Sequence, residues 1–401
     1  MTELRVGTLL ELDIERLAYG GDGIARAGAQ VVFVPFTAPG ERVRARVTEL
    51  HARFARAEVE SVTTASDARR VARCTHFGAC GGCQLQHLTQ PAQLDVKVGF
   101  LHDALVRIGR LEVEVDVEVV SGPEWSYRSR VELAVERHGE HVDVGLLRRG
   151  SSALVPIGMC PIAKPDVESA IAGVRASAPE LPAGVESIVI ESAPEDVLVT
   201  TFPAQARSEA PRVNERVVAG FTLRSDARTF FQANDALASE LVRVAVDGVD
   251  GALALDLFAG VGLFTLPLAR RVDALVAVEE NPVAVAFGRE NTRRSALSNV
   301  RWRTSRVDRW LARSAAELSA VDFVLLDPPR AGAGASTVRA IAALAPREVR
   351  YVSCDPTTLA RDLALFVGAG FRITRIVLVD MFPQTTHVES VVTLRRDAAQ
   401  R

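Results

Sequence analysis

The C-terminal part of the sequence alternates short apolar runs with helical patterns, and this alternation limits the possible folds more than any other feature. From about Thr229 onward, runs of strand length lie at 252–257, 274–278, 323–326, 349–353 and 373–379. Segments with helical spacing fill the gaps, for example 282–295 and 357–368. Strands joined by helices form a parallel sheet that is covered on both faces. We therefore predict an α/β, doubly wound, Rossmann-like domain over residues 229–401.

The first sixty residues carry a different pattern, in which β-rich runs alternate with turns. Strands are expected at 5–12, 30–35, 41–50 and 56–62, with tight turns at 19–23 and 39–40. Short strands at this spacing are typical of a small five-stranded barrel of the oligonucleotide-binding type. We assign residues 1–62 to this barrel.

Residues 63–228 mix both kinds of pattern and are assigned to a central α+β domain. A helix is expected over 92–110, and it places Leu94, Val98, Leu101 and Leu105 on one face that could pack on the C-terminal domain. Paired strands are expected at 127–135 and 141–147, and a second helix at 165–178.

Composition excludes several classes of protein. A hydrophobic fraction of 48% in 401 residues rules out a largely disordered chain, and a net charge of −3 rules out a uniformly basic polyanion binder. Five cysteines are too few for a secreted disulfide scaffold, and the longest apolar run, 252–269, is interrupted by Asp256. We expect a soluble, cytoplasmic protein with no membrane segment and no obligate protein partner.

A glycine-containing loop, 256–264, follows the first strand of the C-terminal domain. Gly260 and Gly262 would let the backbone approach a ligand, and Glu279 ends the next strand, where an acid can hold ribose hydroxyls. The loop has neither the dinucleotide spacing nor a phosphate-binding lysine. A nucleoside cofactor without phosphates therefore fits better, which indicates S-adenosylmethionine, although a simple tight turn would read the same way. Asp308, after the third strand, could reach the adenine or could be an ordinary surface acid.

The segment Asp-Pro-Pro-Arg at 327–330 follows another predicted strand. Its two prolines keep the loop extended at the carboxyl end of the sheet, where ligands bind. Methylases of exocyclic amines place an aromatic residue after a similar motif. Arg330 stands there instead, which argues against amine methylation.

Cys354 ends the next strand, ahead of a helix. A helix N-terminus can lower the pKa of a thiol, so Cys354 is a candidate nucleophile, although a lone thiol is more often structural. A thiolate that adds to carbon 6 of a pyrimidine makes carbon 5 nucleophilic, and a base must later remove the proton from carbon 5. Glu389 is the preferred base, with His387 as a rival.

Three cysteines lie within ten residues, at Cys74, Cys80 and Cys83, and Cys160 stands before Pro161. Four thiolates suit a tetrahedral zinc or an iron–sulfur cluster. The glycine-rich loop and the Cys-Pro pair favour a 4Fe-4S cluster. The spacing differs from the Cys-x3-Cys-x2-Cys of radical S-adenosylmethionine enzymes.

Together, these motifs resemble those of the RNA (uracil-5-)-methyltransferases, specifically the subgroup with a TRAM barrel and an iron–sulfur cluster that acts on 23S ribosomal RNA. The resemblance covers nearly the whole chain and rests on the motifs 19–25, 32–35, 230–234, 256–264, 327–330, 353–356 and 387–389 and on the four cysteines. It implies Cys354 as nucleophile and Glu389 as base. It implies cofactor contacts at Gln232, Phe258, Gly260, Leu263, Glu279, Asp308 and Asp327, where Leu263 replaces the asparagine of some members.

Ribosomal RNA is the preferred substrate, because members that act on transfer RNA tend to lack the barrel and cluster; transfer RNA stays an alternative. Cytosine-5 methylases of RNA use a second cysteine to release the product. Cys354 is the only cysteine after Cys160, so uracil is the preferred base. A noncatalytic RNA-binding protein and a small-molecule methyltransferase also stay open. The target base must leave its stack to react. Arg128, Arg130, Arg148 and Arg149 could form part of a phosphate track, or could be ordinary surface residues.

Overall fold

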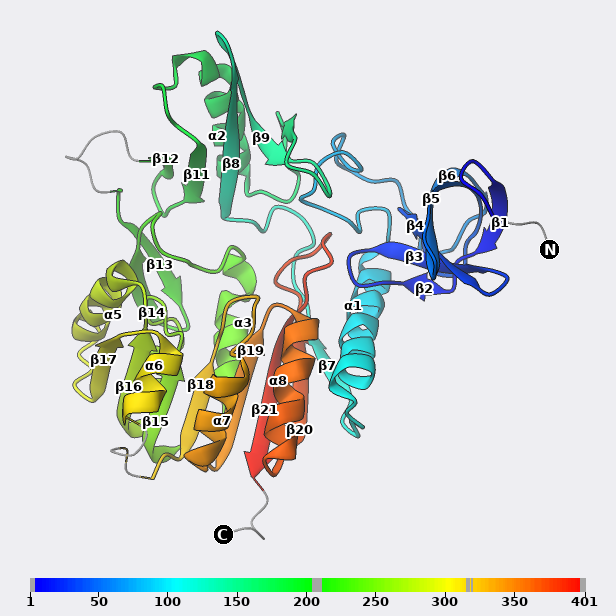
Figure 1. Ribbon diagram of the computed structural model, residues 1–401. Coiled ribbons are helices and arrows are strands. Elements are labelled where there is room, and N and C mark those ends of the chain that lie inside the picture. The colour runs from blue at the N-terminus through cyan, green and yellow to red at the C-terminus, as the bar shows by residue number, and fades with distance from the viewer. Residues whose placement is uncertain (1–3, 204–210, 315–317, 319, 397–401) are drawn as a thin grey trace.

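The computed structural model describes residues 4–203, 211–314, 318 and 320–396. The described chain forms three parts (Figure 1): a barrel near the N-terminus, a central sheet, and an α/β part that ends the chain. The barrel and the central sheet both lie against the same end of the α/β part.

The N-terminal barrel has six strands rather than the predicted five. They are β1 (Leu9–Asp13), β2 (Arg16–Leu17), β3 (Asp22–Ala27), β4 (Gln30–Pro35), β5 (Arg42–Leu50) and β6 (Phe54–Thr64), in the order β1-β5-β6-β4-β3-β2. Neither β2 nor β3 is among the four strand ranges expected: β2 has only two residues, too short to give a periodic signal, and β3 begins inside the expected turn at 19–23. Alternate side chains of β5 are buried, so small and branched residues such as Val43, Ala45 and Val47 fill the barrel.

The central part is a five-stranded antiparallel sheet with one helix. Its strands are β8 (Arg130–His138), β9 (His141–Leu147), β10 (Leu154–Pro156), β11 (Ser187–Ser192) and β12 (Val197–Phe202), in the order β10-β9-β8-β11-β12. The predicted pairing of two strands is confirmed as β8 with β9. Helix α2 (Pro165–Ala176) confirms the predicted helix, and its buried residues Val167 and Ile171 pack on the sheet.

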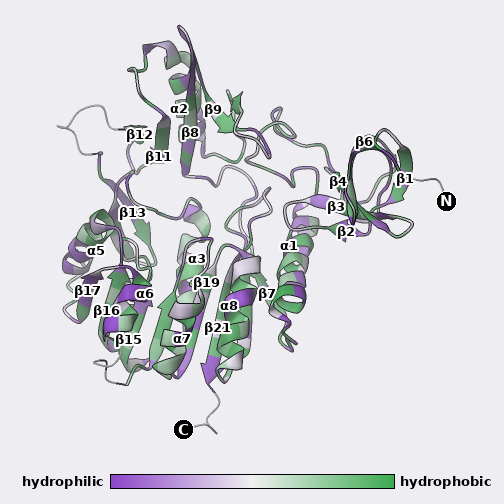
Figure 2. Ribbon diagram, viewed as in Figure 1, coloured by the Kyte–Doolittle hydropathy of each residue, from purple (hydrophilic) through white to green (hydrophobic). Residues whose placement is uncertain are grey.

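The C-terminal sheet has eight strands and confirms the predicted doubly wound fold. Its strands are β7 (Val117–Val120), β15 (Gly251–Leu257), β16 (Val272–Glu279), β17 (Val300–Thr304), β18 (Phe323–Leu326), β19 (Glu348–Ser353), β20 (Phe371–Val379) and β21 (Glu389–Arg396). The order is β17-β16-β15-β18-β19-β21-β20-β7, and the first five strands are parallel. Helices α3 (Asp235–Val246), α4 (Thr265–Ala269), α5 (Pro282–Arg294), α6 (Val307–Ser314), α7 (Ala335–Ala343) and α8 (Pro356–Gly368) accompany them. Two apolar clusters sandwich the sheet, whose strands are largely hydrophobic in Figure 2.

Two elements from residues before 229 pack on this sheet. Strand β7 pairs with β20 at its edge, and helix α1 (Gln90–Ala104) continues as a π-helical turn (Leu105–Gly109) that lies against α8. The predicted face of this helix is right for Leu101 and Leu105. Val98 is partly buried and also packs against this core, but the prediction is wrong for Leu94, because Gln93 and Lys97 take buried positions on the helix instead.

The hairpin of β13 (Asn214–Val218) and β14 (Phe221–Ser225) connects the central part to α3. Among the described residues, no helix has the length and apolar character to cross a membrane.

Candidate active site

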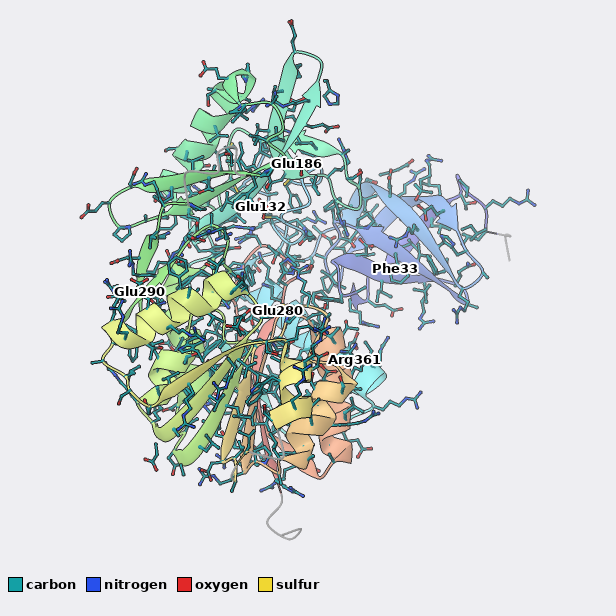
Figure 3. All side chains as sticks on the ribbon, turned by 60° about the vertical axis from the view of Figure 1, so that its left-hand side comes forward. Phe33, Glu132, Glu186, Glu280, Glu290 and Arg361 are labelled. Atoms are coloured by element: carbon teal, nitrogen blue, oxygen red, sulfur yellow. The ribbon has the colours of Figure 1, made fainter. Side chains whose placement is uncertain are left out.

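The glycine loop after β15 is tied to the end of the next strand by Glu279. The Gly260 N–H donates to Glu279 Oε2 at 2.9 Å, and the Asn281 N–H donates to Oε1 at 2.8 Å. Gly260 and Gly262 have φ of 54° and 100°, the left-handed region that glycine adopts without strain. The next residue, Glu280, is exposed (Figure 3). The predicted acid and the predicted loop are therefore in direct contact.

Two buried polar atoms, one at the start of this loop and one just before helix α3, have no hydrogen-bond partner. They are Gln232 Oε1 and Asp256 Oδ1, on residues that are 3% and 0% exposed. Asp256 accepts a hydrogen bond from Thr265 through its other oxygen, and burial raises its pKa to about 7. Unpaired buried polar atoms are costly, and bound ligands commonly satisfy them. Gln232, which chemistry alone would not have selected, therefore fits a cofactor contact.

The other predicted cofactor residues lie around the same strand ends. Phe258 is partly exposed with φ of 65°, and Leu263 is partly buried against the apolar cluster below the loop. Asp308, at the start of α6, forms an ion pair with Arg306 at 2.9 Å, which lowers its pKa. A ligand that uses Asp308 would therefore compete with, or share, the guanidinium of Arg306.

Cys354 and Glu389 are brought together by strand pairing. Ser353 of β19 pairs with Ser390 of β21, so Cys354 and Glu389 are the next residues at the adjoining strand ends. Asp327 follows β18, the parallel neighbour of β19. Both carboxyl groups raise the pKa of the Cys354 thiol, which places all three within electrostatic reach. The predicted nucleophile, base and acid therefore share one edge of the sheet.

The thiol of Cys354 has a raised pKa, so the predicted lowering by the helix N-terminus is wrong. The pKa is raised to about 12, mainly by burial and to a smaller extent by the charges of Glu389 and Asp327. Burial raises the pKa of Glu389 well above its usual value, and that of Asp327 to about 7. Arg330 acts in the opposite direction on Cys354 and Glu389. The substrate-free site therefore favours a neutral thiol.

His387 is poorly suited to be the base. Arg330 Nη2 lies 2.9 Å from His387 Nε2, and burial together with Arg330 lowers the pKa of the imidazole to about 4. Its ring packs edge-on against Phe382. Sequence reasoning missed the role of Arg330, which contacts His387 and acts on the charges of the site. The signal that could have found it is a cation directly after the Asp-Pro-Pro segment.

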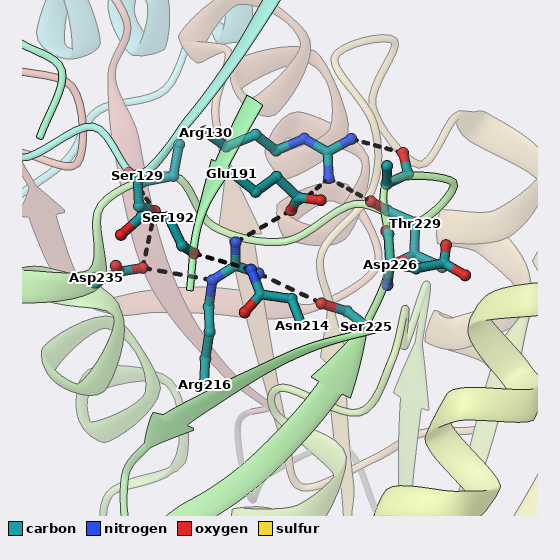
Figure 4. Close-up of polar contacts among 12 residues, drawn as sticks. Ser129, Arg130, Glu191, Ser192, Asn214, Arg216, Ser225, Asp226, Thr229 and Asp235 are labelled. Atoms are coloured by element: carbon teal, nitrogen blue, oxygen red, sulfur yellow. Dashed lines mark hydrogen bonds and ion pairs between the residues drawn. The ribbon is translucent and has the colours of Figure 1, made fainter. Parts of the chain in front are cut away.

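The four arginines of the predicted phosphate track do not form one surface. Arg130 bonds the buried Glu191 and the carbonyls of Ala227 and Thr229 (Figure 4), so its place in the track is wrong. Glu191 also accepts from the buried Arg216 at 3.1 Å. This cluster anchors the loop that leads to Gln232.

The other three arginines differ in their surroundings. Arg128 donates to the Arg130 carbonyl and lines the pocket of the cysteines. Arg149 pairs with Asp22 of the barrel at 2.5 Å, and Arg148 is exposed. Of the four arginines in the predicted phosphate track, Arg148 is therefore the exposed one.

The four central cysteines line a single pocket. Cys74, Cys80, Cys83 and Cys160 are free thiols, and Arg128 and Met159 are among the other residues that line the pocket. The pKa of Cys83 is raised to about 12, mainly by burial and to a smaller extent by Cys160 and Cys80. Within the described ranges, no group of three or more His, Cys, Asp or Glu side chains has the spacing to hold a metal ion.

The fold and the site define a Rossmann-like, S-adenosylmethionine-dependent methyltransferase with an N-terminal TRAM barrel. The family model for tRNA (Uracil-5-)-methyltransferase matches residues 206–397, and the TRAM domain model matches residues 3–59. The chain is 35% identical, over 412 residues, to the 23S rRNA (uracil(1939)-C(5))-methyltransferase RlmD of Klebsiella pneumoniae, covering 94% of this chain and 93% of the relative. The RlmD of Salmonella choleraesuis is 33% identical over 97% of this chain and 96% of its own.

A solved structure shows the same architecture. The tRNA (uracil-54, C5)-methyltransferase of Pyrococcus abyssi, in complex with S-adenosyl-L-homocysteine, aligns with a TM-score of 0.72 and 25% identity. The alignment covers 96% of this chain and all of the other. The chain belongs to the family of RNA (uracil-5-)-methyltransferases.

Proposed function

We propose that this enzyme methylates carbon 5 of a uridine in 23S ribosomal RNA through a covalent adduct on Cys354. The observation that carries the proposal is the meeting of Cys354 and Glu389 at paired strand ends, in the same sheet as the strand that leads into the glycine loop, with β19 two strands away from it. The residues we assign to the cofactor are Gln232, Phe258, Gly260, Leu263, Glu279, Asp308 and Asp327. Bound S-adenosylmethionine supplies an electrophilic methyl group on a sulfonium.

The environment of Cys354 sets the order of proton transfers. Asp327, with a pKa of about 7, is suited to take the thiol proton near neutral pH. The thiolate then adds to carbon 6 of the uracil, and the ring electrons move to form an enolate. Carbon 5 is then nucleophilic enough to take the methyl group that bound S-adenosylmethionine would supply, which would leave a neutral thioether.

Glu389 then takes the proton from carbon 5, and the electrons of that bond reform the ring double bond as the carbon–sulfur bond breaks. Its raised pKa makes Glu389 a stronger base than an exposed carboxylate once it is ionised. The thiolate of Cys354 leaves and takes back the proton that Asp327 accepted in the first step. Glu389 is 3% exposed, which limits the access of water to the base, whereas Cys354 is only partly buried.

The cysteine pocket is proposed to hold a 4Fe-4S cluster through Cys74, Cys80, Cys83 and Cys160. The support is that four free thiols, three from residues 74–83 and the fourth from Cys160, line one pocket. Iron and sulfide analysis of anaerobically purified protein tests this, with a Cys83→Ser variant as control; bound zinc without iron would contradict it.

We retain the division into a barrel at 1–62, a central domain at 63–228 and a catalytic domain at 229–401, with α1 and β7 packing on the last. The ribosomal substrate is supported by curated relatives that match over nearly their whole length. The solved relative acts on transfer RNA, which makes transfer RNA the alternative.

The test supplies unmodified 23S ribosomal RNA and unmodified transfer RNA with labelled S-adenosylmethionine, and maps the label by mass spectrometry. We expect 5-methyluridine in the 23S RNA with wild type and none with Cys354→Ala. Label on transfer RNA alone would overturn the ribosomal substrate. Label that persists with Cys354→Ala would overturn the mechanism.

A further inference from the structure

A turn of the barrel reaches the segment that carries the nucleophile. Tyr19 Oη donates a hydrogen bond to Asp355 Oδ2 at 3.1 Å, although the two residues lie 336 positions apart. Asp355 directly follows Cys354. The Tyr19 ring also packs edge-on against Phe100 of α1, with ring centroids 5.7 Å apart. The phenol is therefore oriented by a neighbour that is itself fixed on the catalytic sheet.

The turn is held tightly just after Tyr19. A Cβ at Gly21 would lie 3.1 Å from Thr386 and 3.2 Å from Gln84, and Gly21 has φ of 92°. Asp22, in the same turn, accepts an ion pair from Arg149 of the central part. This close fit leaves little freedom for the turn to move away from Asp355.

Both carboxylate oxygens of Asp355 are engaged. Oδ1 caps helix α8 by accepting from the N–H groups of Thr357 at 2.9 Å and Thr358 at 3.0 Å. Oδ2 accepts from Tyr19. Cys354 thus lies between the end of β19 and a residue that is fixed at both oxygens, one of them by the barrel.

The charge of the barrel bears on whether RNA binding alone explains the contact between Tyr19 and Asp355. Residues 1–64 hold eight arginines against nine acids, so the barrel is not a basic surface. Arg46 and Arg56 are paired with acids within the barrel, and Arg16 pairs with Asp103 of α1. The barrel therefore offers little net charge to phosphate.

We propose that Tyr19 is a positioning residue of the methyl-transfer reaction: through Asp355 it holds the Cys354 segment in its reactive placement, so the barrel completes the catalytic site. This inference rests on the proposed function for its kinetic consequence. The loss of one partly exposed hydrogen bond to a charged group predicts a drop of about fivefold to tenfold in the rate at the nucleophile.

The test compares Tyr19→Phe, which removes only the hydroxyl, with Arg16→Gln, which removes a different contact between barrel and catalytic part. A 23S RNA fragment containing 5-fluorouridine is the probe, with S-adenosylmethionine present. The rate of covalent adduct formation at saturating RNA and the RNA dissociation constant are measured separately. Amide hydrogen exchange of the peptide that contains 354–358 is measured without RNA.

For Tyr19→Phe we expect a slower adduct rate at saturation, an unchanged dissociation constant and faster exchange in 354–358; Arg16→Gln should match wild type in all three. Weaker RNA binding with an unchanged rate would make Tyr19 an RNA contact and overturn the proposal. Equal effects of both variants would show that Tyr19 only helps to dock the barrel, which would also overturn the proposal. If the wild type forms no adduct, the proposed function fails. Unchanged amide hydrogen exchange of 354–358 in Tyr19→Phe would refute the positioning role of Tyr19 independently of that outcome.

Discussion

Replacing Lys97 with methionine should destabilise the catalytic domain strongly, because Lys97 is a fully buried cation. Its Nζ donates to Asp380 Oδ1 at 2.5 Å and to the Phe382 carbonyl at 2.8 Å, and both side chains of the ion pair are 0% exposed. The second oxygen of Asp380 has no partner in the structure. Methionine would therefore leave a buried carboxylate without any countercharge.

The magnitude follows from that burial. Breaking a buried ion pair by removing one partner costs about 3–5 kcal/mol, which is a large share of the stability of a typical domain. The loss of the ion pair destabilises the segment between β20 and β21, which ends at the proposed base Glu389. Tyr127 also holds this segment, through the Pro383 carbonyl, so the variant should loosen it rather than release it.

Urea unfolding followed by tryptophan fluorescence measures the effect, since Trp302 and Trp310 lie in the C-terminal domain. Lys164→Met is the matched control: Lys164 is the other lysine of the chain, and its ion pair with Asp235 is about one-third exposed on both sides. It should cost less than about 1 kcal/mol.

The double variant Lys97→Met/Asp380→Leu removes both charges and should recover at least half of the loss, since an apolar pair can replace a buried ion pair. The reasoning is refuted if Lys97→Met costs no more than Lys164→Met, or if the double variant is as unstable as the single one.

Three further predictions concern the cofactor loop, the thiol and the barrel junction. Glu279→Ala removes the acceptor of two backbone N–H groups and should weaken binding of S-adenosyl-L-homocysteine about tenfold or more by calorimetry; unchanged affinity would contradict the role of Glu279. Asp327→Asn removes a charge that raises the pKa of Cys354, so iodoacetamide should alkylate this thiol several-fold faster at pH 8 in the RNA-free protein, and a slower reaction would oppose the electrostatic account. His87 is 3% exposed, donates to the Thr37 carbonyl at 3.0 Å, and has a pKa that burial lowers from 6.5 to about 4. Because the unfolded chain takes up this proton first, the free energy of unfolding should fall by up to about 3 kcal/mol as pH drops from 6.5 to 4, and His87→Gln should lose that slope.

The parallel sheet could be predicted because its strands are buried on both faces and therefore appear in the sequence as continuous apolar runs. β18 matches its predicted bounds, and the other predicted strands of this sheet begin or end within two residues of theirs. Strand β7 could not be found in this way, since it is a four-residue edge strand in which Glu118 interrupts the apolar residues. Its place became clear only through its pairing with β20.

The members of the site could be proposed from the sequence, but their electrostatics could not. The expected lowering of the Cys354 pKa came from a local feature, the start of α8. The groups that reverse it, Asp327 and Glu389, come from distant positions and act through folding and burial. The same limit explains Arg130, because an arginine that is buried in an ion pair has the same sequence signature as one that faces solvent.

The central claim is that the Cys354 sulfur adds to the target uracil, and peptide mapping of the trapped complex tests this most directly. Wild-type enzyme is incubated with S-adenosylmethionine and a 23S RNA fragment containing 5-fluorouridine, whose fluorine cannot leave as a proton does. After digestion with protease and nuclease, mass spectrometry should find one methylated fluorouridine attached to the peptide that contains Cys354. A methylated base with no attached peptide, or attachment at another residue, would contradict the account.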